Sequence, residues 1–116
     1  MKFIEQFDTY ACIGDYISVD INGVTFTAYL DSDADSRPED FDCYSEEDIE
    51  RFYKEDWYYV CIIIEAETDD WKKTLYGSSV WGVEINFGTD DRPHLMELAN
   101  ECLADAIASL SERAAA

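Results

Sequence analysis

Apolar and polar residues alternate through the segment "YISVDINGVTFTAYL" (Tyr16–Leu30), which is typical of a β-hairpin with one buried face. Asn22-Gly23 at its centre is the dipeptide preferred in two-residue type I′ loops. Such a loop pairs Ile21 with Val24 and sets the register of both strands. The same register places two more apolar pairs opposite each other, Val19 with Phe26 and Ile17 with Ala28.

Two further strands are expected later in the chain. "WYYVCIIIEA" (Trp57–Ala66) is apolar on both faces, as in the central strand of a sheet. "SSVWGVEINF" (Ser78–Phe87) alternates instead, and "ETDDWKK" between the two is typical of a turn. The inward-pointing residues of the last strand are predicted to be Trp81, Val83, Ile85 and Phe87.

A capping pattern marks the start of a helix between the hairpin and these strands. Ser45 opens "SEED", which fits the S-x-x-[DE] capping box, and its first-turn carboxylates suit the positive end of a helix dipole. The helix is predicted to run to about Asp56. Its core-facing residues would be Ile49, Phe52 and Tyr53.

The longest helical pattern lies near the C-terminus. Asp90 or Asp91 is a candidate cap, and Pro93 lies in the first turn. Apolar residues then recur at i, i+3 and i+4 spacing over about four turns. This stripe consists of Leu95, Leu98, Ala99, Cys102, Leu103, Ala106, Ile107 and Leu110.

The element order β-β-α-β-β-α predicts an α+β fold, an antiparallel four-stranded sheet with helices packed on one face. A short additional helix is expected over Lys2–Asp8, where Phe3, Ile4 and Phe7 would share one side. The chain has 116 residues, of which 47% are hydrophobic, and it contains no repeat or Pro/Gly-rich linker. We therefore expect a single domain spanning residues 1–116.

The opening "MKFIEQFDTYACIGD" lacks the apolar region of a signal peptide, because Glu5 and Asp8 interrupt it. No apolar run reaches the ~18–20 residues that a membrane-spanning helix needs. We therefore expect a cytoplasmic protein that binds no membrane. We also expect it to form a monomer or a small homo-oligomer. The cysteines lack C-x-x-C spacing and are expected to be free, buried thiols. They are Cys12, Cys43, Cys61 and Cys102.

The charge balance excludes several partners. The chain has 27 acidic and 8 basic residues, a net charge of −19. A surface of that sign repels nucleic acid and anionic membranes, so direct binding to either is not expected. The complementary partner is basic, such as the nucleic-acid-binding surface of another protein. The charge is concentrated between Asp31 and Asp56, where twelve carboxylates and three basic residues give a net charge of −9.

Salt adaptation and calcium binding are also consistent with this acidic stretch. Salt-adapted proteins are acid-rich and lysine-poor, although their acids spread over the whole surface. The segment "DSDADSRPEDFD" places Asp31, Asp33, Asp35 and Asp42 at positions 1, 3, 5 and 12 of a calcium-binding EF-hand loop. It departs from that loop at Ser36, at Pro38 and in having Asp42 where glutamate is preferred. A calcium-dependent binding module is therefore an alternative to our main expectation, which includes no metal ion or cofactor.

No catalytic arrangement is visible along the chain. The single histidine, His94, lies near Asp90, Asp91 and Glu97 and is expected to be solvated or to act as a cap. No Ser/His/Asp or Cys/His set and no glycine-rich nucleotide loop is present. We expect a protein that is not an enzyme.

Tyrosines accompany the carboxylates. The tyrosines nearest to acidic stretches are Tyr10, Tyr16, Tyr29, Tyr44 and Tyr53. Tyrosine beside carboxylates forms a favourable protein-binding surface, especially for arginine, which pairs with the acids and stacks on the rings. Ordinary packing of these rings is equally consistent with the sequence. An accessory protein that binds another protein through this aromatic surface is thus a second alternative function.

The main hypothesis is mimicry of DNA. A duplex presents one negative charge per ~1.7 Å of its axis, and helix residues three or four apart lie ~5–6 Å from each other. A rigid domain with carboxylates at such spacing can occupy a nucleic-acid channel lined by Lys and Arg. The candidate partner-binding residues are Asp33, Asp35, Glu39, Asp40, Asp42, Glu46, Glu47 and Glu50.

Both ends of the chain resemble small uncharacterised proteins of phages and prophages. The resemblance lies in "FIEQFDTYACIGDYISVDINGVTFTAYL" near the N-terminus and in "SVWGVEINF" and "LMELANECLADAIASL" near the C-terminus. It implies a phage protein that acts in the cytoplasm of a bacterial host. Small, strongly acidic phage proteins are similar to DNA mimics that inhibit CRISPR effectors or restriction enzymes, so the resemblance implies that kind of inhibitor.

Overall fold

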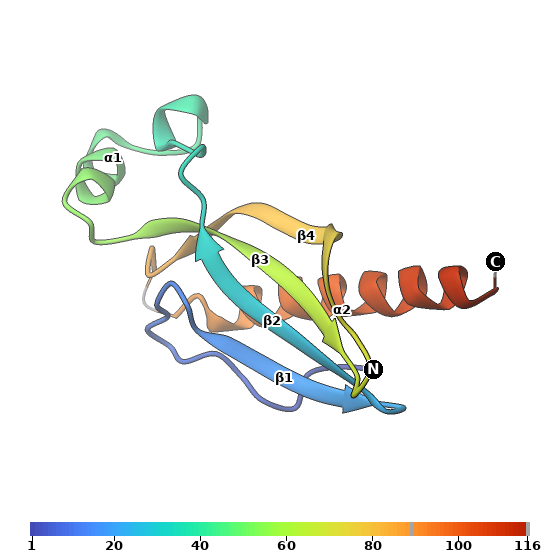
Figure 1. The fold of residues 1–116 in the computed structure, drawn as a ribbon. Coiled ribbons are helices and arrows are strands. Elements are labelled where there is room, and N and C mark those ends of the chain that lie inside the picture. Colours follow the sequence, from blue (N-terminus) through green and yellow to red (C-terminus); the bar gives the residue numbers. More distant parts are fainter. Residues whose placement is uncertain (89, 116) are drawn as a thin grey trace.

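The structure, a computed structural model, describes residues 1–88 and 90–115. Its strands are β1 (Tyr16–Ile21), β2 (Val24–Ser32), β3 (Tyr58–Glu67) and β4 (Lys72–Ile85). A 3₁₀ turn, η1 (Pro38–Asp40), and helix α1 (Glu46–Tyr53) lie between β2 and β3, and helix α2 (Arg92–Ala115) follows β4. The strands form one antiparallel sheet in the order β1-β2-β3-β4 (Figure 1). The predicted α+β fold with a four-stranded antiparallel sheet is therefore confirmed.

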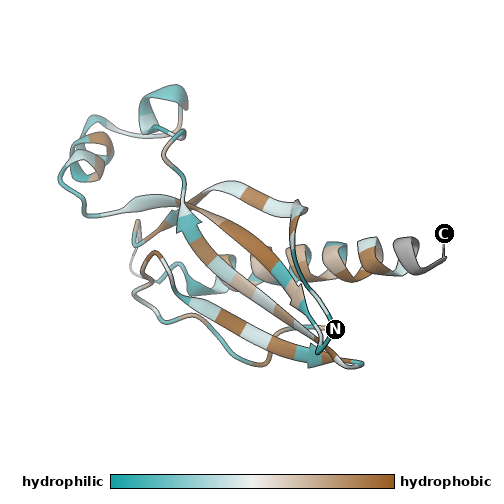
Figure 2. Ribbon diagram, viewed as in Figure 1, coloured by the Kyte–Doolittle hydropathy of each residue, from teal (hydrophilic) through white to brown (hydrophobic). Residues whose placement is uncertain are grey.

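The β1–β2 hairpin has the predicted register. Ile21 pairs with Val24, and the two further apolar pairs are also present. Asn22 and Gly23 have φ values of 51° and 84°, as a type I′ turn requires at both central residues. Alternate side chains point to the same face, and Phe26 is buried on the apolar one. Figure 2 shows the resulting bands of apolar and polar residues along both strands.

Helix α2 covers one face of the sheet, where the main core lies. Its predicted apolar stripe is confirmed, with Leu95, Ala99 and Leu103 buried against the strands. Strand β3 lies between β2 and β4, as expected of a strand that is apolar on both faces, and Ile62 and Ile64 are fully buried. Each large aliphatic side chain buried in this way stabilises the fold by about 1.5–3 kcal/mol.

The N-terminal segment packs into this core without forming a helix. Phe3 and Phe7 are buried, but Ile4, predicted to share their side, is exposed. The backbone N–H of Phe3 donates to the side chain of Asn100 in α2 at 2.9 Å. The predicted helix over Lys2–Asp8 is wrong, because the segment is held by contacts with α2 rather than by hydrogen bonds within itself.

Strand β4 differs from the prediction at both ends. It begins at Lys72, within the expected turn, and ends at Ile85. Val83 and Ile85 are buried as predicted. Phe87 lies beyond the strand and packs against Trp57, with ring centroids 4.9 Å apart, instead of joining the main core.

A bulge in β4 accounts for one wrong side-chain prediction. Val60 pairs with Val83 and Ile62 with Val80, so β4 has one more residue than β3 between these pairs. An extra residue in one strand reverses the alternation of its side chains. Trp81, predicted to point inward, is 55% exposed for this reason.

The prediction that the helices pack on one face of the sheet is wrong for α1, which lies beyond the end of the sheet, next to η1, and not on the face that α2 covers (Figure 1). Helix α1 ends at Tyr53 and is shorter than predicted. Ile49 and Phe52 are half-buried, but Tyr53, predicted to face the core, is 56% exposed. The difference arises because α1 packs on aromatic side chains near Trp57 rather than on the aliphatic core.

All four cysteines are free thiols. Cys61 and Cys102 are buried as expected, whereas Cys12 and Cys43 are exposed. The two exposed thiols lie in irregular segments, where the sequence has no periodicity from which burial could be predicted.

Candidate functional site

Residues 33–56 project from one end of the sheet, between the end of β2 and the start of β3 (Figure 1). We call this segment the acidic lobe, because it contains all eight predicted partner-binding carboxylates. Its shape is held by a helix cap, an aromatic cluster and one buried aspartate.

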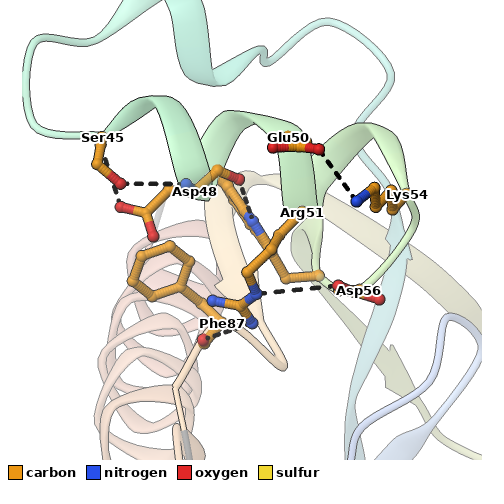
Figure 3. A network of polar contacts seen from close by, with 8 residues as sticks. Ser45, Asp48, Glu50, Arg51, Lys54, Asp56 and Phe87 are labelled. Atoms are coloured by element: carbon orange, nitrogen blue, oxygen red, sulfur yellow. Dashed lines mark hydrogen bonds and ion pairs between the residues drawn. The ribbon is translucent and has the colours of Figure 1, made fainter.

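The helix cap is the one predicted from the sequence. The Ser45 hydroxyl accepts the backbone N–H of Asp48, and the Asp48 carboxylate accepts that of Ser45, both at 3.1 Å (Figure 3). Glu46 and Glu47 also lie in the first turn, where the helix dipole favours negative charge. The dipole therefore offsets part of the repulsion between these neighbouring carboxylates.

Arg51 and Trp57 attach α1 to the rest of the protein. The Trp57 Nε1–H donates to the carbonyl oxygen of Asp48 at 2.9 Å. Arg51 donates from Nη2 to the carbonyl oxygen of Phe87 at 3.2 Å and lies 5.8 Å from the centre of its ring (Figure 3). Arg51 also forms a 3.9 Å ion pair with Asp56. The arginine thus points toward the protein and does not screen the outer carboxylates.

An aromatic cluster lies beneath α1 and is separate from the main core. Trp57, which is fully buried, stacks on Tyr44 at 5.2 Å and contacts Phe52 at 5.0 Å and Tyr59 at 5.1 Å between ring centroids. Aromatic pairs at these separations add about 0.5–1.5 kcal/mol each beyond the burial of area. The cluster consists of Phe41, Tyr44, Phe52, Trp57, Tyr59 and Phe87.

Polar groups of this cluster connect it to β4. The Tyr44 hydroxyl donates to the carboxylate of Glu84. Burial, the bond to Glu84 and neighbouring Tyr59 together raise the pKa of Tyr44 far above its ordinary value. The buried hydroxyl of Tyr59 has no hydrogen-bond partner among the described residues. Tyr44 is therefore held as a neutral donor that ties the lobe to the sheet.

Asp33 has a structural role inside the lobe. It is only 6% exposed and accepts hydrogen bonds from the N–H of Asp35, from the N–H and hydroxyl of Ser36, and from the N–H of Gly82. Burial raises the pKa of Asp33, but the bonds from Ser36, Gly82 and Asp35 outweigh it and lower the pKa overall. The prediction that Asp33 belongs to the partner-binding surface is wrong, because its carboxylate is buried and accepts hydrogen bonds from within the protein.

The other seven predicted residues are all exposed. Two of them have partners within the protein: Glu39 accepts the Tyr53 hydroxyl, and Glu50 forms a 3.0 Å ion pair with Lys54 (Figure 3). The remaining five form no ion pair or side-chain hydrogen bond with another described residue. These five free carboxylates of the lobe are Asp35, Asp40, Asp42, Glu46 and Glu47.

The carboxylates of the EF-hand-like segment are not gathered into a metal site. Asp31 lies in β2 and accepts the N–H of Ser32, while Asp33 is directed inward. Within residues 1–88 and 90–115, no group of three or more His, Cys, Asp or Glu side chains is placed to hold a metal ion. The calcium alternative therefore has no assembled site among the described residues.

A second set of acids, not singled out from the sequence, lies on α2. Glu97, Glu101 and Asp105 are exposed at successive i, i+4 positions, a spacing that the sequence does contain. Burial raises the pKa of the Cys102 thiol to about 11, and nearby Asp105 and Glu101 contribute. His94, in the first turn of the same helix, is exposed.

Comparisons with protein-family models, with curated proteins and with solved structures found no match to this chain. Among the described residues, no helix is both long enough and apolar enough to span a membrane. The features that bear on function are therefore those of the fold and its surfaces, namely an α+β domain with a braced acidic lobe.

Proposed function

We propose that this protein is an acidic phage-type inhibitor that binds the basic nucleic-acid-binding surface of a bacterial defence protein, a CRISPR effector or a restriction enzyme. In this proposal the acidic lobe takes the place of nucleic-acid phosphates. The observation that supports it most directly is the presence of five free carboxylates on one braced, projecting segment. The resemblance of both chain ends to phage proteins is consistent with it.

The overall charge density is of the same order as that of DNA. The longest extent of the molecule is 49 Å, which for a net charge of −19 gives about 2.6 Å per charge, against ~1.7 Å along a duplex. A channel lined by Lys and Arg that accepts DNA would therefore meet a comparable negative field.

The internal bracing of the lobe favours a binding role over a solvated spacer. Repulsion among neighbouring carboxylates works against order, yet a capping box, a buried Trp57 and the buried Asp33 hold this segment in one shape. A preordered surface loses little conformational entropy on binding, which strengthens the complex. A flexible acidic linker would need none of these contacts.

The test begins in bacteria that carry an active CRISPR or restriction system. Expression of the protein is expected to restore plating of a targeted phage. With the purified effector, the protein should then displace a fluorescent DNA duplex, less effectively as salt rises, because screening weakens the charge contacts. If the protein neither restores plating of phage nor displaces DNA from the effector in any of a panel of such systems, the proposed function is wrong.

A charge-matched pair of variants tests which surface acts. Asp42→Asn/Glu46→Gln/Glu47→Gln neutralises three free carboxylates of the lobe, and displacement is expected to weaken roughly tenfold. Glu97→Gln/Glu101→Gln/Asp105→Asn removes the same charge from α2 and should displace DNA nearly as well as the original protein. Circular dichroism checks that α1 remains folded. Equal losses in both variants would mean that overall charge, and not the lobe, determines binding.

A further inference from the structure

On the side away from the acidic lobe, no helix of the described residues packs on the face of the sheet opposite α2. Helix α2 and the N-terminal segment pack on one face only (Figure 1). On the other face, the strand register places Tyr16 opposite Tyr29 and Tyr29 opposite Ile63. Tyr76 follows Leu75, whose side chain is in the core, where a second irregularity of β4 begins. Its exposure and its effect on the pKa of Tyr29 are consistent with a place on this open face.

Tyr16, Tyr29 and Ile63 form a row across the first three strands, and Tyr76 lies near its end in β4. Tyr16 and Tyr76 are 69% and 68% exposed, Tyr29 is half-buried, and Ile63 is almost fully buried between neighbours. Burial raises the pKa of Tyr29, and nearby Tyr76 and Glu65 raise it further, which is consistent with their placement around it. Single exposed apolar residues are common on protein surfaces, but adjacent tyrosines on one open face are typical of protein-binding surfaces.

The charges on this face are mostly negative. The strand alternation puts four carboxylates and one basic residue beside the tyrosine row. The basic residue, Lys72, forms a 3.3 Å ion pair with Glu65. The four carboxylates are Asp20, Asp31, Glu65 and Glu67.

An open depression lies at one end of the row. Its volume is about 430 Å³, and its lining residues include Tyr16, Tyr29 and Glu65. Two aromatic rings and the Glu65 carboxylate, which an incoming arginine would share with Lys72, thus border one shallow space. Arginine matches this combination, because its planar guanidinium stacks on a ring and pairs with a carboxylate at the same time, whereas the lysine ammonium is a strongly hydrated point charge.

The same charges disfavour two other occupants. Single-stranded nucleic acid stacks its bases on aromatic rings, but here its phosphates would approach carboxylates. A second copy of this chain would bring two negative faces together.

We propose that the open face of the sheet is a second binding surface, which takes arginine side chains of a basic protein at Tyr16, Tyr29 and Glu65. It assumes the same class of partner as the proposed function, but it depends on a different surface. The two proposals can therefore fail separately.

The test compares two peptides of equal charge, hexa-arginine and hexa-lysine, titrated into the protein at low salt and followed by NMR and calorimetry. Hexa-arginine is expected to bind about threefold to tenfold tighter, since only its side chains gain the stacking contact. The largest chemical-shift changes from hexa-arginine should lie at Tyr16, Tyr29 and Glu65. Equal affinities of the two peptides would overturn the proposal.

Variants separate the aromatic contact from the charge. Tyr16→Ala/Tyr29→Ala removes both rings of the proposed site and is expected to abolish the preference for arginine while leaving hexa-lysine binding nearly unchanged. Tyr16→Phe/Tyr29→Phe keeps the rings and should keep the preference. A preference that survives in the alanine variant would overturn the assignment.

Two further titrations distinguish this surface from the acidic lobe and from a nucleic-acid site. The variant Asp42→Asn/Glu46→Gln/Glu47→Gln should weaken both peptides to a similar degree and leave the arginine preference intact. Oligothymidine should not shift the tyrosine resonances at physiological salt. Binding of oligothymidine at this face would overturn the proposal in favour of a nucleic-acid surface.

Discussion

The carboxylate of Asp33 accepts the backbone N–H of Gly82 at 2.7 Å, although the two residues are 49 positions apart in the sequence. The contact joins the start of the acidic lobe to the bulge of β4. The same carboxylate also holds the turn at Ser36 through the backbone and the hydroxyl. One buried ionised group therefore sets both the direction of the lobe and the local shape of the edge strand.

Asp33→Asn is expected to lower the free energy of unfolding by about 1–3 kcal/mol at pH 7, because hydrogen bonds to an ionised acceptor are lost or weakened. Chemical unfolding followed by circular dichroism measures the change. Asp35→Asn, at an exposed neighbour, is the control and should stay within about 0.5 kcal/mol of the original protein. Equal stabilities of the two variants would contradict the role of Asp33.

The contribution of Asp33 should also depend on pH. Despite its burial, hydrogen bonds lower the pKa of Asp33 in the folded state below the unfolded value of about 3.9. Its stabilisation is therefore complete above the unfolded pKa and is lost as the pH falls through the folded pKa. The difference in unfolding free energy between the original protein and Asp33→Asn should shrink below about pH 4. A difference that stays constant from pH 7 to pH 3 would exclude the ionised carboxylate as its source.

Gly82→Ala tests the backbone of the bulge. Gly82 has φ of +69°, and an added Cβ would lie 3.5 Å from the Ser36 hydroxyl, so conformation rather than contact opposes the substitution. We expect a loss of about 1–2 kcal/mol, the cost of left-handed backbone for a residue with a side chain. Gly77→Ala, in the same strand with open space around it, is the control. A loss no larger than that of the control would show that the bulge does not depend on glycine.

The parts of the fold predicted correctly are those determined locally. The Asn22-Gly23 turn, the Ser45 capping box and the stripe of α2 each depend on residues close together in the sequence, where turn chemistry and periodicity are visible. The errors arise where distant residues decide the outcome. Trp81 is exposed because a bulge shifts β4 against β3, and no pattern within β4 reveals it.

The candidate site shows the same division. Glu46 and Glu47 are exposed because they lie opposite the apolar side of a short helix. The spacing of apolar residues in the sequence is enough to predict this. The burial of Asp33 depends on Gly82, and the aromatic cluster depends on Phe87 reaching Trp57 from beyond β4. The acidic stretch is visible in the composition of the sequence. Only the tertiary contacts distinguish its free carboxylates from those that form hydrogen bonds or ion pairs within the fold.

Ser45→Ala tests how far the capping box maintains α1. Loss of the hydroxyl that accepts the Asp48 N–H is expected to cost about 0.5–2 kcal/mol. Hydrogen exchange should speed up at the amides of Glu46–Tyr53, and helical circular dichroism should fall slightly. Ser111→Ala, at an exposed position within α2, is the matched control. Unchanged exchange in α1 would show that the aromatic cluster alone keeps the helix formed.

Trp57→Phe tests whether the aromatic cluster holds the acidic lobe independently of the main core. The variant loses the hydrogen bond to the Asp48 carbonyl and part of a fully buried ring system, at a cost of about 1–3 kcal/mol. Because the cluster is separate from the aliphatic core, the loss should appear as local opening. Amide exchange across residues 46–56 is expected to rise about tenfold or more, while amides in β2 and β3 stay protected. Trp71→Phe, in the turn between β3 and β4, controls for the loss of an indole. Uniformly faster exchange across the sheet would mean that lobe and sheet unfold together, and that Trp57 belongs to one continuous core.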